Sequence, residues 1–441
     1  MNIKVYQLLK ITVFNLLIVS FLGVIMRYKI AFYFPFLEQK HLQEAHSHFA
    51  FYGWISSAIY LFIHQILQEK MRKEKCSGFY NAIIINFFAS YGMLFSFLYG
   101  GYFWLSIVFS SVSLFCSFVI FFILINNHKN LETSSKLWFL GGLFFAVFSS
   151  FGVFSLSFMK IFNIISQDLY LASTYFYLHF QYNGFFLFSC IGLFIYALEK
   201  IGAKLNSSEI RFTFWLFFSS CIIGFGLSVL WLQLPIWLYS IIVLASFVQV
   251  FASQKLFAIV KKNWQLVLEK FTSLERFILL FAGAAFFMKI ALQLVSTIPA
   301  VSQFAFGFRN IVIAYLHLVL LMCITGFLIF NLLTSKIFRT NTIFILGIKL
   351  FFFGIFLNEL VLGINGILSI KYISLPYSQY ILFGISILIM LSLLLVFVFS
   401  QCVFAQTFEI KGKISDKTTK DPLIGAAIEV KGKGTGTVAD L

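Results

Sequence analysis

Residues 45–67 read AHSHFAFYGWISSAIYLFIHQIL, an apolar run without Asp, Glu, Lys or Arg. At 1.5 Å per residue, such a run is long enough to cross a hydrocarbon core of roughly 30 Å as an α-helix. Similar runs recur along the chain. We predict twelve membrane-spanning helices, at residues 10–33, 45–67, 79–99, 102–125, 137–158, 169–198, 211–231, 235–257, 273–297, 310–333, 341–366 and 378–400.

The composition points to the same class of protein. Hydrophobic residues make up 61% of the chain, charged residues make up 11%, and there are 62 phenylalanines. A water-soluble domain of this length does not have such a composition. No basic arm, zinc-finger spacing or RNA-binding signature is present, so we expect a lipid bilayer as the partner and no nucleic acid. The predicted fold is all-α and integral to the membrane.

The distribution of Lys and Arg predicts the orientation. With the N-terminus inside, 18 of these residues fall in the inner segments and six in the outer segments. Cytoplasmic loops collect positive charge, so we predict a multi-pass protein of the bacterial inner membrane with a cytoplasmic N-terminus. The net charge of +16 then reflects topology and contact with anionic lipid.

An internal repeat relates the second, sixth and tenth predicted helices. The second contains His48-Phe with Gly53 five residues after the histidine, and the sixth contains His179-Phe with Gly184 at the same spacing. The tenth keeps only the histidine, His317. The three histidines are 131 and 138 residues apart, which is four helices in each case. We therefore predict three four-helix arcs, with the histidine helix second in each.

Four histidines are the predicted ligands of a cofactor: His46, His48, His179 and His317. All lie in the first third to half of helices that run from outside to inside, so their imidazoles are expected at similar depth. Imidazole is an axial ligand of haem iron. Residues two apart on a helix point about 200° apart, so one of His46 and His48 is expected to pair with His317 and the other to face His179. Arg309 is the predicted partner of a haem propionate.

Each of these residues also has a plainer interpretation. An intramembrane histidine often makes a structural hydrogen bond between helices, and Arg309 also suits an ordinary interfacial anchor. Gly53 and Gly184 would admit a porphyrin or, equally, a closely packed neighbouring helix. The six cysteines are isolated, without the CxxCH motif of covalent haem attachment, and we interpret them as small buried hydrophobes.

The helix layout and the segment Ala45-His46-Ser47-His48 with Gly53-Trp54 resemble the catalytic subunit I of haem-copper oxidases and nitric oxide reductases. The resemblance covers about residues 10–400 in layout and short motifs in sequence. It implies haem, suspected to be of the b type, and an electron donor such as a quinol or cytochrome c. If the protein is an enzyme, the resemblance implies an oxidoreductase of that type.

The departures from that superfamily limit what the resemblance implies. Its His-x-His pair belongs to the tenth helix, whereas here it lies on the second, and the adjacent His-His of its seventh helix is missing from residues 211–231. We therefore expect no complete binuclear centre and no copper. The chain is also similar to the twelve-helix haem proteins of the NnrS type, which belong to the bacterial nitric oxide response. Electron transfer and a nitric oxide response both remain open.

Three other ionisable residues are expected to be buried within predicted helices, namely Lys289, Lys349 and Glu359. Buried charge is expensive in a membrane, so we interpret them as a possible proton path or as partners of one another. Lys349 also lies near a helix end, where its amine can extend to the interface. A secondary transporter with structural histidines is the alternative function, although five prolines and few acidic residues in the spans disfavour it.

The end of the chain differs in composition. Residues 1–400 form the predicted membrane domain, and residues 401–441 are polar and rich in Gly and Lys, with short alternating segments. The segments at 411–416, 421–426 and 430–437 resemble the start of the carboxypeptidase-regulatory-like β-sandwich of SusC-type TonB-dependent receptors. We therefore expect a truncated β-type fragment, or a gene fusion, that does not contribute to the membrane function.

Overall fold

The computed structural model describes residues 3–70, 77–128, 131, 133–373, 375–402, 414–416, 418–419, 421–423, 425–429 and 436–438. The chain forms two compact units, Met1–Cys402 and Val403–Leu441. The boundary between them lies next to the predicted division after residue 400. Each unit is described by itself below.

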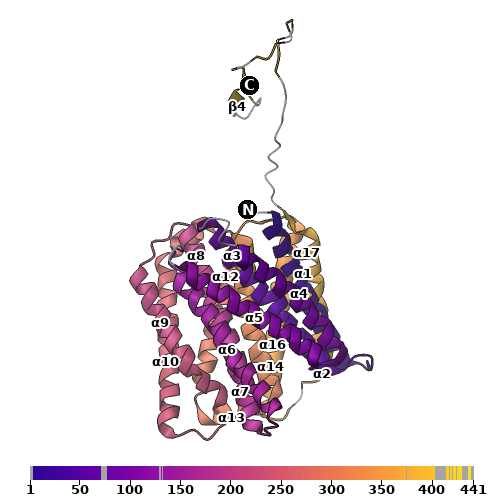
Figure 1. Ribbon diagram of the computed structural model, residues 1–441. Coiled ribbons are helices and arrows are strands. Elements are labelled where there is room, and N and C mark those ends of the chain that lie inside the picture. Colours follow the sequence, from indigo (N-terminus) through magenta and orange to yellow (C-terminus); the bar gives the residue numbers. More distant parts are fainter. Residues whose placement is uncertain are drawn as a thin grey trace. The chain divides into compact units, whose positions relative to one another are not determined.

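The first unit is a helical bundle (Figure 1). Among the described residues, twelve helices are long and apolar enough to cross a membrane, which confirms the predicted all-α fold and identifies a multi-pass membrane protein. Nine spans are built on a single α-helix: α1 (Ile3–Ala31), α4 (Ser77–Gly100), α5 (Trp104–Asn127), α6 (Lys136–Ile161), α9 (Ser207–Gly224), α10 (Ile236–Lys262), α12 (Ser273–Val295), α16 (Thr342–Ile370) and α17 (Ser378–Phe399). Two short helices, α11 (Trp264–Lys270) and α13 (Pro299–Gly307), connect spans.

Most predicted helix ends agree with the structure to within four residues, but α1 begins at Ile3 instead of residue 10, the second span begins at Gln39 instead of residue 45, and α10 ends at Lys262 instead of residue 257. Polar caps explain several of the ends. The Asn206 side chain accepts hydrogen bonds from the first backbone amides of α9, and Asn341 caps α16 in the same way. Thr272 and Glu275 form a reciprocal capping box at α12. These side chains satisfy N–H groups that have no partner within the helix.

The second, sixth and tenth spans are each divided into three pieces. The second consists of α2 (Gln39–His48), η1 (Phe49–Ser56) and α3 (Ser57–Lys70). The sixth consists of α7 (Gln167–His179), η4 (Phe180–Phe186) and α8 (Leu187–Lys200). The tenth consists of α14 (Arg309–His317), η6 (Leu318–Thr325) and α15 (Gly326–Thr334). All three middle pieces are π-helices, and each begins at the residue after a histidine.

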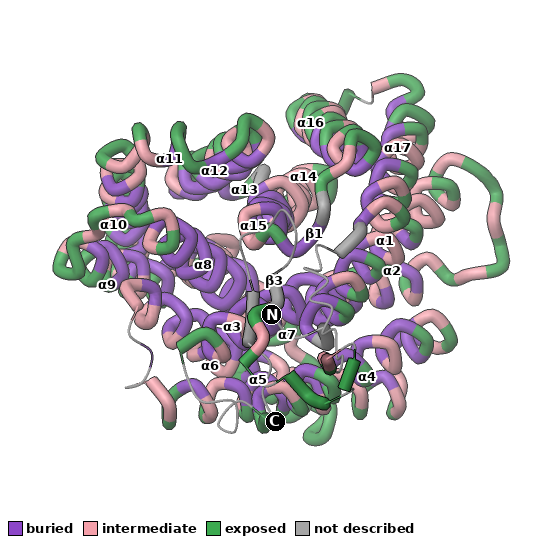
Figure 2. Tube along the Cα trace, turned by 90° about the horizontal axis from the view of Figure 1, so that it is seen from above, coloured by how far each residue is buried: buried purple, intermediate pink, exposed green. Residues whose placement is uncertain are grey.

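These three spans contact one another inside the bundle. The π-helices and following α-helices of the second and sixth spans are almost entirely buried, as the purple tubes of α3 and α8 show in Figure 2, whereas α2 and α7 are only partly buried. Phe51 of η1 packs edge-on against Phe186 of η4, with ring centroids 5.2 Å apart. The Trp54 indole donates to the Thr325 hydroxyl at 3.1 Å, which joins the second span to the tenth. The second, sixth and tenth spans hold equivalent positions in the repeat, and together they therefore form the core of the bundle.

Polar side chains hydrogen-bond to backbone carbonyls in the π-helices, where the regular α-helical hydrogen bonds are interrupted. A π-helix bonds i to i+5, so it disturbs the regular α-helical ladder. Asn15 of α1 donates to the carbonyl of Gly53 at 2.6 Å, and Asn86 of α4 donates to that of Tyr52 at 3.2 Å. In η6 the Thr325 hydroxyl bonds to the carbonyl of Leu320 at 2.9 Å. Such partners are needed because a membrane interior offers no water to unpaired backbone groups.

The described strands are short. In the first unit, β1 (Phe338–Arg339) pairs with β2 (Gln401–Cys402) in antiparallel fashion. In the second unit, β3 (Ala427–Glu429) pairs with β4 (Gly436–Val438), also antiparallel. The start of the predicted β-type fragment, at residues 403–413, lies outside the described residues.

Candidate functional site

The four predicted ligand histidines lie in the same layer of the bundle. We call the end where α1 ends and α2 begins the outer end, following the charge distribution. The helices α2, α7 and α14 start from this end, have 10, 13 and 9 residues, and each stops at a histidine. At 1.5 Å per residue, the four histidines lie roughly 12–20 Å along their spans.

Two of the four are brought together. His317 has His46 among its electrostatic neighbours, and Arg27 of α1 is a neighbour of both imidazoles. Both rings are half-buried, on facing parts of α14 and α2. Farther outward, the Arg309 guanidinium donates to the Gln43 side chain at 3.3 Å, which ties the same two helices together. His46, His317 and Arg27 are therefore the core of the candidate site.

One face of α1 forms a wall of this site. Val19, Gly23 and Arg27 follow one another at intervals of four residues, so they share a face. The backbone of Val19 hydrogen-bonds to His46. A Cβ placed on Gly23 would lie 3.7 Å from Cε1 of His46, so the imidazole packs directly against this glycine. Arg27 adds a positive charge one turn farther along.

The hydrogen bonds of the two rings define which nitrogens are free. Nδ1 of His317 lies 2.8 Å from the carbonyl oxygen of Ile313, and a carbonyl only accepts, so Nδ1 carries the proton. The neutral ring then presents the lone pair of Nε2. Nδ1 of His46 is buried without a hydrogen-bond partner among the described residues, so in the neutral ring that carries its proton on Nε2, Nδ1 presents a free lone pair. Each ring thus keeps one unprotonated nitrogen, which is the form that binds a metal.

His48 points elsewhere. Its Nδ1 donates to the carbonyl of Glu44 at 3.0 Å, its Nε2 is 3.0 Å from the hydroxyl of Tyr102, and its ring stacks on Phe97. Burial raises the pKa of Tyr102, which keeps that hydroxyl protonated and able to donate. Both nitrogens of His48 are therefore occupied by protein groups.

His179 is fully hydrogen-bonded as well. Its Nε2 donates to the carbonyl of Cys221 at 2.9 Å, and its Nδ1 accepts from the Asn183 amide at 3.1 Å and lies 3.4 Å from the Ser228 hydroxyl. The side chain is completely buried. The structure does not bring it to His48, so the expected second pair is not formed. A structural hydrogen bond between helices describes His179 better than ligation.

One repeated glycine, Gly184, faces a neighbouring helix, and the other, Gly53, leaves room for an aromatic ring of its own span. A Cβ on Gly184 would lie 2.5 Å from the Cβ of Phe145 on α6, and one on Gly53 would lie 2.8 Å from the ring of Phe49. Real Cβ atoms do not approach so closely. Of the two interpretations of these glycines, close packing of aromatic side chains is the one that the geometry supports.

The other predicted site residues are dispersed. Arg309 is exposed and bonded to Gln43, so Arg27 is the cation nearer to the histidines. Lys289 is buried, and its amine has no hydrogen-bond partner among the described residues. Lys349 is exposed, as expected of a side chain that extends to the interface. Glu359 accepts from the Asn358 amide at 3.1 Å and has Arg27 as an electrostatic neighbour.

Arg27 is the residue that the sequence analysis missed. It was counted as one of the outer loop charges, although it is half-buried at the end of α1 and faces both histidines and Glu359. The signal that could have found it is the four-residue spacing of Asn15, Val19, Gly23 and Arg27. This face of α1 is the one that contacts the second span.

No family model matches the sequence, and no curated protein is significantly similar to it. Within the described part of the chain, no group of three or more His, Cys, Asp or Glu side chains converges as a non-haem metal site would require. The site is therefore interpreted from its own geometry.

Proposed function

We propose that this chain is a haem-binding integral membrane protein, in which His46 and His317 would hold the haem iron. The observation that carries the proposal is the pair itself: two imidazoles from the second and tenth spans, each with one unprotonated nitrogen, beside a shared arginine. Haem iron bound there would supply one-electron redox chemistry. The b type remains the expected form, because the chain has no CxxCH motif.

The surrounding residues fit such a group. The second nitrogen of each ring bonds to a backbone carbonyl, an arrangement that orients an imidazole and raises its basicity toward a metal. Gly23 keeps the wall of α1 thin beside His46. Arg27 provides the positive charge that a propionate requires, and it replaces Arg309 in that role. His48 and His179 are structural residues in this proposal.

The function that we propose from this is a role in respiration or in nitric oxide chemistry, without a complete binuclear centre. The resemblance to subunit I of haem-copper oxidases and nitric oxide reductases, and to NnrS-type proteins, motivates electron transfer or a nitric oxide response. His46 and His317 form one pair of ligands, which would account for one haem and for no second metal. The bacterial inner membrane and a quinol or cytochrome c donor belong to this proposal.

A reduced-minus-oxidised absorption spectrum of the purified chain, expressed with haem supplied, tests the proposal. We expect a b-type spectrum that is lost in His46→Ala and in His317→Ala. His128→Ala is the matched control, because His128 is at the end of α5, outside the site, and should leave the spectrum unchanged. A colourless wild-type protein would refute the proposal and favour the secondary transporter. A spectrum that survives His317→Ala would refute the ligand assignment.

A further inference from the structure

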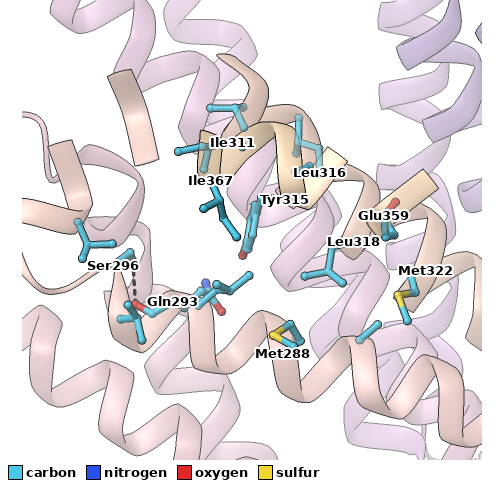
Figure 3. A pocket seen from close by; sticks show the side chains of 18 of the residues that line it. Met288, Gln293, Ser296, Ile311, Tyr315, Leu316, Leu318, Met322, Glu359 and Ile367 are labelled. Atoms are coloured by element: carbon cyan, nitrogen blue, oxygen red, sulfur yellow. Dashed lines mark hydrogen bonds between the residues drawn. The ribbon is translucent and has the colours of Figure 1, made fainter. Parts of the chain in front are cut away.

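A cavity of about 730 Å³ lies on another face of the tenth span, between α12, α14 and α16, and residues of α7, η4 and η5 also line it (Figure 3). Tyr315, Leu316 and Leu318 line it, whereas His317 does not. Its volume is in the range of small-molecule sites. The cavity is therefore distinct from the histidine pair, although both use the same helix.

The cavity opens sideways, toward the surface that lipid covers. Its walls on α12 and α16 include Met288, which is 55% exposed, and Ile367, which is 67% exposed. Farther from the outer end the same two helices touch, since the rings of Phe281 and Phe352 have centroids 5.2 Å apart. The helices thus diverge toward the outer end, and a molecule dissolved in the bilayer can enter between them.

The charge of the walls restricts the occupant. No Lys, Arg, His or Asp is among the lining residues that the structure describes, and Glu359 is the acidic one. The electrostatic neighbour of Glu359 is Arg27, which offsets its charge. An anionic lipid headgroup would find no basic side chain here, and a free cation would compete with that arginine. The walls suit an uncharged molecule.

A buried acceptor without a partner shows what the occupant must offer. Gln293 is 7% exposed, and its Oε1 has no hydrogen-bond partner among the described residues. Figure 3 shows the hydroxyl of Tyr315 directed toward Gln293 within the cavity. A buried acceptor that stays unsatisfied costs about 1–3 kcal/mol. A hydroxyl donor on the occupant would remove that penalty.

We propose that this cavity binds an uncharged, membrane-dissolved molecule with an aromatic body and a hydroxyl donor, that is, a phenolic lipid. The hydroxyl donates to Oε1 of Gln293. The aromatic body packs against Tyr315 and the thioether of Met288, since sulfur and aromatic rings attract. The alkyl part extends through the lateral opening into the bilayer.

Binding of 4-nonylphenol and of its methyl ether, 4-nonylanisole, to the full chain in nanodiscs tests the proposal, with empty nanodiscs as background. The ether replaces the phenolic O–H by O–CH3, so it lacks the donor and is larger by one methyl group. We expect saturable 1:1 binding of the phenol, about 5-fold tighter than that of the ether, which is the contribution of one net hydrogen bond. Gln293→Leu is expected to remove this difference.

A matched pair of glycine variants locates the site. Gly363 lines the cavity, and a Cβ there would meet nothing within 4 Å, so Gly363→Phe fills the space without a backbone clash. Gly384 of α17 is equally open but does not line the cavity. Gly363→Phe should abolish binding of both probes, and Gly384→Phe should preserve it. If Gly363→Phe is not recovered folded, Gly363→Leu replaces it.

Three results would overturn the proposal: no saturable binding, equal affinity of wild type for both probes, or unchanged binding by the filled variant. A phospholipid that copurifies and that the phenol does not displace would also overturn it, because the cavity would then hold a charged headgroup.

Discussion

Replacing His179 by Leu separates a structural histidine from a ligand. At the end of α9 the helix tightens into η5 (Phe225–Val229). The backbone N–H of Phe225 bonds there to the carbonyls of Ile222 and Ile223, so the carbonyl of Cys221 is left without its regular partner in the helix. Nε2 of His179 donates to that carbonyl at 2.9 Å. The histidine therefore caps a helix end inside the membrane.

The expected loss follows from the bonds that disappear. Leu fills similar space but leaves the Cys221 carbonyl and the Asn183 amide without their partner. A single hydrogen bond between membrane helices contributes about 0.6 kcal/mol on average, whereas a buried group left unsatisfied costs about 1–3 kcal/mol. The second effect dominates here because no water reaches a completely buried side chain. We expect His179→Leu to lower the free energy of unfolding by about 2 kcal/mol.

His64→Leu is the matched control. His64 is also buried, at 1% exposure, but neither ring nitrogen has a hydrogen-bond partner among the described residues. The same substitution there removes an unsatisfied polar group, so it should be neutral or stabilising. Unfolding by an SDS titration in mixed micelles, followed by circular dichroism, compares the two variants. Equal stability of the two variants would contradict a structural role of His179. A His179→Leu protein that is as stable as wild type but has lost bound haem would contradict it as well.

Three further substitutions test the packing and polar contacts of the bundle, each by the thermal midpoint in detergent. Gly184→Ala should destabilise by roughly 1–3 kcal/mol through its clash with Phe145, whereas Gly384→Ala should stabilise slightly; equal midpoints would contradict the close packing. Lys289→Met should raise the midpoint because it removes a buried amine without a partner, and a lower midpoint would indicate that the amine has one. Trp54→Phe, which removes the indole donor between two central spans, should cost about 0.6 kcal/mol; no loss would mean that the bond is dispensable.

The helices were predictable because each depends on a local property. An apolar run of sufficient length must form a helix in a bilayer, since its backbone groups have no other partners. All twelve predicted spans are found among the described residues. The π-helices were not predictable in this way. They depend on partners such as Asn15 and Asn86, which lie on other spans, so a local pattern does not contain them.

Two of the three residues of the candidate site, His46 and His317, were named from the sequence, whereas Arg27 was not. The repeat led to these histidines, and in the structure every π-helix begins directly after one of the repeated histidines. Which histidines would face each other depends on the rotation of each helix within the bundle, and Arg27 depends on which side of α1 faces inward. Spacing along one helix gives relative directions, but the absolute rotation comes from contacts with neighbouring helices.

The repeat also explains why equivalent histidines have different partners. The position before each π-helix places an imidazole where the backbone ladder changes, and the neighbouring span determines what it bonds. The hydroxyl of Tyr102, in the α4–α5 connection, hydrogen-bonds to His48. The carbonyl of Cys221, at the end of α9, accepts a hydrogen bond from His179. At His317 the neighbouring group is another imidazole, His46, and Nε2 of His317 keeps its lone pair. Of the three equivalent positions, the tenth span is therefore the one where a metal-bound cofactor would compete least with the hydrogen bonds that hold the fold.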